Sequence, residues 1–225
     1  MTNKKAVIFD MDGVIIDSEQ FWKQAENEVF SSLGVKITDE YCKTTRSMTT
    51  SEVARFWYGK SPWQGKPLDI VEQMVISRVI GLIETEECCI IPGIKTFIEK
   101  LKTQNYKIGL ATNSPNRIIP VVLKKLGAPH LFDAVSSAEF EKKGKPDPAI
   151  YLATAQKLCI EPEDCIAIED SRSGMVAAKS AGMTVVAYTN GNRDFNLGIA
   201  DYRIDNFEHL NDSLGEKLKT CTKPI

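Results

Sequence analysis

The sequence predicts an α/β protein in which a doubly wound parallel sheet, covered by helices on both faces, carries an inserted all-helical cap domain. Short runs that are apolar almost throughout recur along the chain, as expected of parallel strands buried on both faces. Segments with helical periodicity alternate with these runs, and this alternation favours a doubly wound sheet. Residues 18–87 break the alternation, because they contain helix-period apolar positions but no credible buried strand.

Five apolar runs are the expected strands, and a closing strand and helix are expected after Tyr202. The five runs cover residues 6–9, 107–111, 134–136, 165–168 and 184–187.

Helical patterns lie between these runs. Two of them follow Pro92 and Pro148, and another ends at Gly182, which suits a helix C-cap. Pro120 falls inside a further helical pattern and would remove a backbone donor there. We therefore expect that helix to begin near Ile119.

The sequence pattern of the insert predicts three helices that form a domain of their own. Its first apolar positions recur every four residues and stop at Gly34, a second helix follows a cap at Thr49, and a third covers residues 68–82. The expected division is a core of residues 1–17 and 88–225 and a cap of residues 18–87. An insert placed directly after the first strand would stand over that strand's carboxyl end, so we interpret it as a lid.

Composition limits the partners of the protein. The 225 residues include 28 basic and 30 acidic side chains, and no stretch gathers Lys and Arg as a nucleic-acid or membrane surface would. No apolar span approaches membrane length. The six cysteines lack CxxC spacing, and we expect reduced thiols. We expect a cytoplasmic monomer that acts on a small molecule and binds neither nucleic acid nor membrane.

Two carboxylates mark the end of the first strand. Asp10 and Asp12 follow the apolar run 6–9 and precede Gly13. The carboxyl end of a central strand is where open α/β sheets bind ligands. Because two like charges so close repel each other, a cation is expected between them, and Mg²⁺ prefers carboxylate and carbonyl oxygen.

Three further elements follow in a fixed order. Thr112 ends the second strand, Lys145 lies between Gly144 and Pro146, and Glu169 and Asp170 end the fourth strand. With Asp10 and Asp12, this set resembles the haloacid dehalogenase superfamily of phosphohydrolases. The resemblance covers nearly the whole chain and implies a Rossmann-like core.

The spacing is similar to the β-phosphoglucomutase-like branch of that superfamily, in which a helical cap is inserted after the first motif. Here Asp10-Met11-Asp12-Gly13-Val14 is followed by Asp17-Ser18-Glu19. Other features resemble bacterial 2-deoxyglucose-6-phosphate phosphatases, also described as hexitol phosphatases. They are Phe21-Trp22, Trp57-Tyr58, Pro62-Trp63, Ala138-Glu139 and Glu169-Asp170-Ser171.

The resemblance implies a phosphatase for small sugar phosphates. Asp10 would attack phosphorus to form an aspartyl phosphate, and Asp12 would serve as general acid and then general base. Thr112, the amide of Asn113 and Lys145 would bind the phosphoryl group. Mg²⁺ would be held by Asp10, by the backbone carbonyl of Asp12 and by Asp170, with Glu169 as a ligand or as an orienting residue.

Two departures from the branch affect the substrate. Trp22 stands where mutases of this branch carry a histidine, which favours a phosphatase over a mutase. Its side chain is expected either in the cap core or, as a substrate-binding residue, on the wall that faces the substrate. In the loop 45–49, Arg46 precedes the point where relatives place a glycine and then a basic residue. Either Arg46 takes over a substrate contact or the pocket recognises a different sugar.

Two alternatives to a phosphatase stay open. A β-phosphoglucomutase-type mutase would use the same chemistry and return the phosphoryl group to sugar. A non-enzymatic phospho-accepting signalling module would use an Asp, a Thr or Ser, a Lys and an acidic pair. Its usual order places the lysine last, whereas Lys145 precedes Glu169 here.

Overall fold

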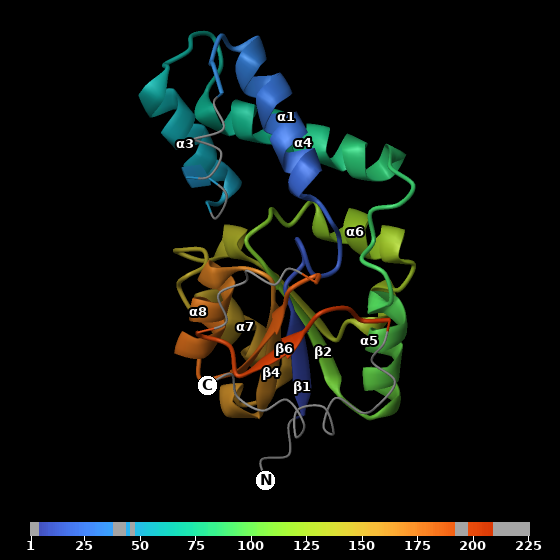
Figure 1. Ribbon diagram of the computed structural model, residues 1–225. Coiled ribbons are helices and arrows are strands. Elements are labelled where there is room, and N and C mark those ends of the chain that lie inside the picture. The colour runs from blue at the N-terminus through green and yellow to red at the C-terminus, as the bar shows by residue number, and fades with distance from the viewer. Residues whose placement is uncertain (1–4, 38–43, 46–47, 192–197, 209–225) are drawn as a thin grey trace.

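The computed structural model describes residues 5–37, 44–45, 48–191 and 198–208, and over these residues it is an α/β protein built on a parallel sheet (Figure 1). The sheet has six strands in the order β3-β2-β1-β4-β5-β6, and every neighbouring pair is parallel. The predicted fold class is confirmed. The strands are β1 (Ala6–Phe9), β2 (Lys107–Thr112), β3 (Ala134–Ser137), β4 (Cys165–Glu169), β5 (Thr184–Tyr188) and β6 (Tyr202–Ile204).

Helices cover both faces of the sheet. Along β1, Val7 and Phe9 belong to an apolar cluster with the buried side chains of α5 and α6, whereas Ala6 and Ile8 belong to a second cluster with those of α7 and α8. This division follows from the two-residue period of a strand. The four helices are α5 (Ile94–Thr103), α6 (Ile119–Leu126), α7 (Ala149–Leu158) and α8 (Arg172–Ser180).

The predicted strands are all present, and four of them extend further at their carboxyl ends than the apolar runs. These extensions bring Thr112 into β2 and Glu169 into β4. The helix α6 begins at Ile119, so Pro120 lies in its first turn, where a backbone N–H has no intrahelical partner. β6 matches the expected closing strand, while the expected closing helix lies outside the described residues.

Three helices of the insert lie beyond the carboxyl ends of the strands (Figure 1). Both α1 (Glu19–Ser32) and α3 (Thr50–Lys60) pack against α4 (Leu68–Thr85). Thr49 caps α3 through a reciprocal capping box with Glu52, which satisfies two backbone donors of the first turn. The predicted helices of the cap are confirmed, and the boundaries of the cap as a domain stay a prediction.

The chain enters and leaves the insert side by side. The backbone N–H of Ile91 donates to the carbonyl of Ile15 at 2.9 Å, and that of Asp17 donates to the carbonyl of Cys89 at 2.8 Å. The insert is therefore joined to the sheet by two paired segments, directly above the end of β1.

The described helices include none that is both long and apolar enough to cross a bilayer. Among the described cysteines, Cys88, Cys89, Cys159 and Cys165 are free thiols. Cys42 and Cys221 lie outside the described residues.

Candidate active site

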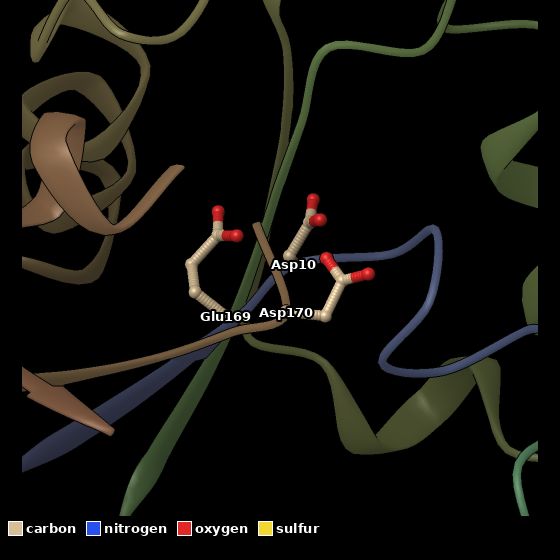
Figure 2. Close-up of side chains that lie close together, drawn as sticks. All are labelled: Asp10, Glu169 and Asp170. Carbon is tan, nitrogen blue, oxygen red and sulfur yellow. The ribbon is translucent and has the colours of Figure 1, made fainter. Parts of the chain in front are cut away.

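Acidic and hydroxyl side chains of the candidate active site lie together where three neighbouring strands end. β1 pairs with both β2 and β4, so Asp10, Thr112 and Glu169 lie at the same edge of the sheet. The strand order also reverses direction at β1, which is the crevice where doubly wound sheets bind ligands. Figure 2 shows the carboxylates of Asp10, Glu169 and Asp170 close together at this edge.

The three carboxylates form an acidic cluster. One oxygen of each lies within 4.8 Å of the others, and Asp10 and Glu169 are buried. Burial, followed by the charge of Glu169, raises the pKa of Asp10 well above its ordinary value, although Lys145 opposes this shift. An oxygen-rich cluster of this kind has the ligand chemistry of Mg²⁺, and Asp10 and Asp170 are the residues best suited to hold it.

Gly13 makes room for one of these carboxylates. A Cβ built on Gly13 would lie 2.0 Å from Oδ2 of Asp170, and the residue also has a φ of +80°. Both the space and the backbone conformation therefore require glycine. Gly13 thus leaves open the space that the side chain of Asp170, a residue distant in the sequence, occupies.

Lys145 is buried beside the acidic cluster. Its ammonium donates to Oδ1 of Asp10 at 2.7 Å, to Oε1 of Glu169 at 2.6 Å and to the carbonyl of Ala111 at 2.9 Å. All three donors of the ammonium are used. Burial lowers the pKa of Lys145, but the charges of Asp10 and Glu169 outweigh burial, so that its pKa lies above the ordinary value and the group stays cationic.

Glu169 is held on both of its oxygens. Oε1 accepts from the hydroxyl of Tyr151 at 2.6 Å as well as from Lys145, and Oε2 accepts from the hydroxyl of Ser171 at 3.0 Å. A Cβ on Gly174 would lie 1.9 Å from Oε1, so the carboxylate occupies space that only glycine leaves open. These contacts fix the orientation of Glu169, and its role as a metal ligand or as an orienting residue stays a prediction.

Tyr151 is a part of this network that the sequence did not predict. It lies on α7 and is fully buried, and burial, together with the charge of Glu169, raises the pKa of its hydroxyl well above the usual range. The hydroxyl therefore stays protonated and donates to Glu169. No sequence signal marks this tyrosine, because it is one of several large side chains along an ordinary helix.

Asp12 is not a member of the acidic cluster and accepts four hydrogen bonds. Ser18 and Trp22 donate to Oδ1, and the Trp22 bond is 3.0 Å long. Thr112 and Ser114 donate to Oδ2 at 3.2 Å and 2.7 Å. Asp12 therefore joins the first turn of α1 to the end of β2.

Trp22 packs against the apolar core cluster that includes the buried side chains of the insert, and its place on a wall that faces the substrate stays a prediction. Its side chain is partly buried, and its indole N–H bonds the carboxylate of Asp12. Ser18 and Ser114, which also bond Asp12, were not predicted as site residues. Two weak signals mark them, because Ser18 occupies the N-cap position of α1 and Ser114 lies two residues beyond the end of β2.

Asn113 organises the loop that carries Lys145. Its Oδ1 accepts from the backbone N–H of Lys145 at 2.8 Å. The Thr112 hydroxyl, besides donating to Asp12, accepts from the backbone N–H of Ser114 at 3.0 Å. The structure thus brings Asp10, Asp12, Trp22, Thr112, Asn113, Lys145, Glu169 and Asp170 together, while Arg46 lies outside the described residues.

A polar pocket of about 280 Å³ lies between the first turn of α3 and the loops of the core. The insert meets the core at its edge, where a Cβ on Gly144 would lie 2.9 Å from the methyl carbon of Thr49. A second pocket, of about 500 Å³, lies between α1 and α4, and its lining includes no residue of the acidic cluster. The polar pocket is lined in part by Ser51, Arg55, Glu72, Asn113, Glu139 and Lys142.

Comparisons with known proteins agree with this geometry. Residues 7–188 match the family described as haloacid dehalogenase-like hydrolase. Hexitol phosphatase B of Escherichia coli strain K12 is 38% identical over 208 residues, which cover 91% of this chain and 93% of that protein. β-Phosphoglucomutase of Bacillus subtilis strain 168 is 33% identical over 198 residues, covering 83% and 84%. The crystal structure of β-phosphoglucomutase from Clostridium difficile superposes with a TM-score of 0.82 at 30% identity, covering 96% of this chain and 97% of that one.

Proposed function

Because this chain belongs to the haloacid dehalogenase-like hydrolase family, we propose that it is a magnesium-dependent phosphatase that hydrolyses small sugar phosphates of the 2-deoxyglucose-6-phosphate or hexitol phosphate type. The observation that carries the proposal is the position of Asp10. This carboxylate lies at a strand end, is a member of the acidic cluster and contacts the buried ammonium of Lys145.

Charge is the first obstacle to the reaction. Bringing an anionic nucleophile to a phosphate dianion costs about 4 kcal/mol per pair of unit charges at 4 Å and an effective dielectric constant of 20. Lys145 supplies one positive charge in direct contact with Asp10. Mg²⁺, when held by Asp10, Asp170 and the backbone carbonyl of Asp12, would supply two more.

Asp10 is the proposed nucleophile. A bond forms between a carboxylate oxygen of Asp10 and phosphorus while the phosphorus–oxygen bond to the sugar breaks, which leaves an aspartyl phosphate. Asp12 donates a proton to the departing sugar oxygen. It then takes a proton from the water that attacks the aspartyl phosphate, and inorganic phosphate leaves.

Thr112, Asn113 and Lys145 are the proposed phosphoryl-binding residues. The hydroxyl of Thr112 and the Asn113 amide lie at the end of β2, beside Asp10, the residue that follows β1. In addition, the Asn113 side chain holds the backbone of Lys145. Fixing the phosphate in line for attack lowers the entropic part of the barrier.

A mutase is the alternative that the relatives themselves raise, because two of them are β-phosphoglucomutases. Trp22 favours the phosphatase, since it occupies the position of the histidine that mutases of this branch carry. Membership of a hydrolase family also argues against the non-enzymatic signalling module. A cytoplasmic location and a monomeric state are part of the same proposal.

The test is a phosphate-release screen on purified protein. Hexose, deoxyhexose and hexitol phosphates are supplied with Mg²⁺, then with a chelator, and free phosphate and isomerised sugar phosphate are both measured. We expect Mg²⁺-dependent release of phosphate. An isomer that accumulates faster than free phosphate would indicate a mutase instead.

Asp10→Asn is the matched variant for this screen. An amide is a poor nucleophile, so we expect turnover to fall by a factor of about a thousand or more. Asp69→Asn, at an exposed position of α4, should turn over like the wild type. Wild-type turnover by Asp10→Asn would remove the proposed mechanism.

A further inference from the structure

Glu26 lies on the same line of α1 as two residues that contact Asp12. Ser18, Trp22 and Glu26 are spaced four apart, so they follow one another along one face of the helix. The first two donate hydrogen bonds to the carboxylate of Asp12. Glu26 lies one helical step of four residues, about 6 Å along the helix axis, beyond Trp22.

Contacts of the next turn of α1 show which elements this face of the helix is turned toward. Phe30, four residues after Glu26, packs against Trp57 of α3 with ring centroids 6.1 Å apart, and against Trp63 at 5.9 Å. Glu26 therefore lies between the aromatic core of the insert and the residues that hold Asp12. This is the α3-facing side of α1, above the catalytic edge of the sheet.

The carboxylate of Glu26 is partly buried and has no hydrogen-bond or ion-pair partner among the described residues. Burial alone raises the pKa of Glu26 to about 7. Glu28, two residues later on the same helix, is exposed and is bonded by Arg78. A partly buried carboxylate without a partner among the described residues loses part of its hydration, and such groups concentrate at functional sites.

We propose that Glu26 is a specificity-determining residue whose carboxylate hydrogen-bonds the hydroxyl groups of the sugar or sugar alcohol, while the phosphate is bound at Asp10. This proposal rests on the proposed function. Hydroxyl groups are donors, and an ionised carboxylate offers only acceptors, so the two are complementary. The same charge repels a second phosphate, and the favoured substrates are therefore polyhydroxylated monophosphates rather than bisphosphates.

The experiment compares two substrates in three proteins. The kcat/KM values for a hexitol phosphate and for p-nitrophenyl phosphate, which has no sugar hydroxyl, are measured at pH 8 with Mg²⁺ for the wild type, Glu26→Ala and Glu28→Gln. We expect Glu26→Ala to lower kcat/KM for the hexitol phosphate by roughly 10- to 100-fold, the effect of losing hydrogen bonds to a charged group. The ratio between the two substrates should change at least about ten-fold in Glu26→Ala and stay constant in Glu28→Gln.

The outcomes separate the two proposals. An unchanged ratio in Glu26→Ala, on a wild type that hydrolyses the hexitol phosphate, overturns the role of Glu26 and leaves the proposed function standing. A wild type that hydrolyses p-nitrophenyl phosphate but no sugar phosphate overturns both. An equal fall for both substrates together with a lower melting temperature identifies Glu26 as a structural residue and also overturns the proposal.

Discussion

The indole Nε1 of Trp22 donates a hydrogen bond to Oδ1 of Asp12 over 3.0 Å, and this contact connects the inserted helices to the end of the first strand. Ser18 bonds the same oxygen, whereas the other oxygen is bonded by Thr112 of β2 and by Ser114, two residues beyond that strand. The orientation of Asp12 is thus set jointly by the insert and by the sheet. Any change in the position of α1 acts on the proposed acid and base.

Trp22→Phe tests whether this bond positions Asp12. The variant keeps an aromatic ring and loses the N–H donor, so we expect kcat for a sugar phosphate to fall roughly ten-fold with a smaller change in KM. Trp63→Phe is the control, because it loses an indole bond to the carbonyl of Lys66, away from Asp12. A raised KM at constant kcat in Trp22→Phe would instead make Trp22 a wall of the substrate pocket.

Lys145→Met tests the buried ion pairs. Removing the ammonium leaves Asp10 and Glu169 as buried carboxylates without a cation, and breaking a buried pair in this way costs about 3–5 kcal/mol of unfolding free energy. Urea denaturation without Mg²⁺ measures the loss. Lys124→Met, at an exposed position, should stay within about 0.5 kcal/mol of the wild type.

The double variant Lys145→Met with Glu169→Gln separates charge from packing. If the cost comes from an uncompensated charge, removing one of the two carboxylates should recover part of it. A double variant that is less stable than Lys145→Met by the full cost of Glu169→Gln would contradict this explanation.

Glu26→Gln should change stability in a pH-dependent way. The pKa of Glu26 is raised from 4.5 to about 7 in the folded protein. Below about pH 4.5 both states are protonated and the group contributes nothing. As the pH rises toward 7, the unfolded chain ionises first, so the wild type loses stability, and above pH 7 it bears the whole penalty.

The variant removes this penalty. We therefore expect Glu26→Gln to match the wild type at pH 4.5 and to exceed it at pH 8, by at most about 3 kcal/mol of unfolding free energy. Urea denaturation at the two pH values measures the difference. Glu28→Gln should show no such gain at pH 8, and a Glu26→Gln gain that is equal at both pH values would rule out ionisation as the cause.

Mg²⁺ should stabilise the folded protein by neutralising the acidic cluster. A ligand that binds only the folded state adds about 2.7 kcal/mol at one hundred times its dissociation constant. The melting temperature should rise with Mg²⁺ and return with a chelator. Asp170→Asn should lose most of this rise and Asp69→Asn should keep it, while a full response in Asp170→Asn would exclude Asp170 as a ligand.

The strands and the insert were accessible from sequence because their signals are local. The run Ala6–Phe9 is apolar at every position, and β1 has these bounds in the structure. Pro120 indicates the start of α6, because proline has no backbone N–H and fits only the first turn of a helix. The loss of strand-like runs over residues 18–87 likewise indicates helices without any knowledge of distant contacts.

The candidate site residues also differ in how far local sequence signals predict their positions. Asp10, Thr112 and Glu169 follow apolar runs, and the ends of parallel strands meet at one edge, so their proximity follows from the order of the elements. Lys145 is different, because its three bonds to Asp10, Glu169 and Ala111 depend on where a loop after β3 folds back.

Residues 6–9 and the acidic groups that follow the strands thus specify a parallel sheet with charged strand ends, because hydrophobic period and strand-end position are properties of short segments. The bond from Trp22 to Asp12, the bond from Tyr151 to Glu169 and the lack of a partner for Glu26 within the described part of the chain are decided only by how distant helices pack. A hydrogen bond needs two groups within about 3 Å, and segments far apart in the chain reach that distance only through the tertiary fold.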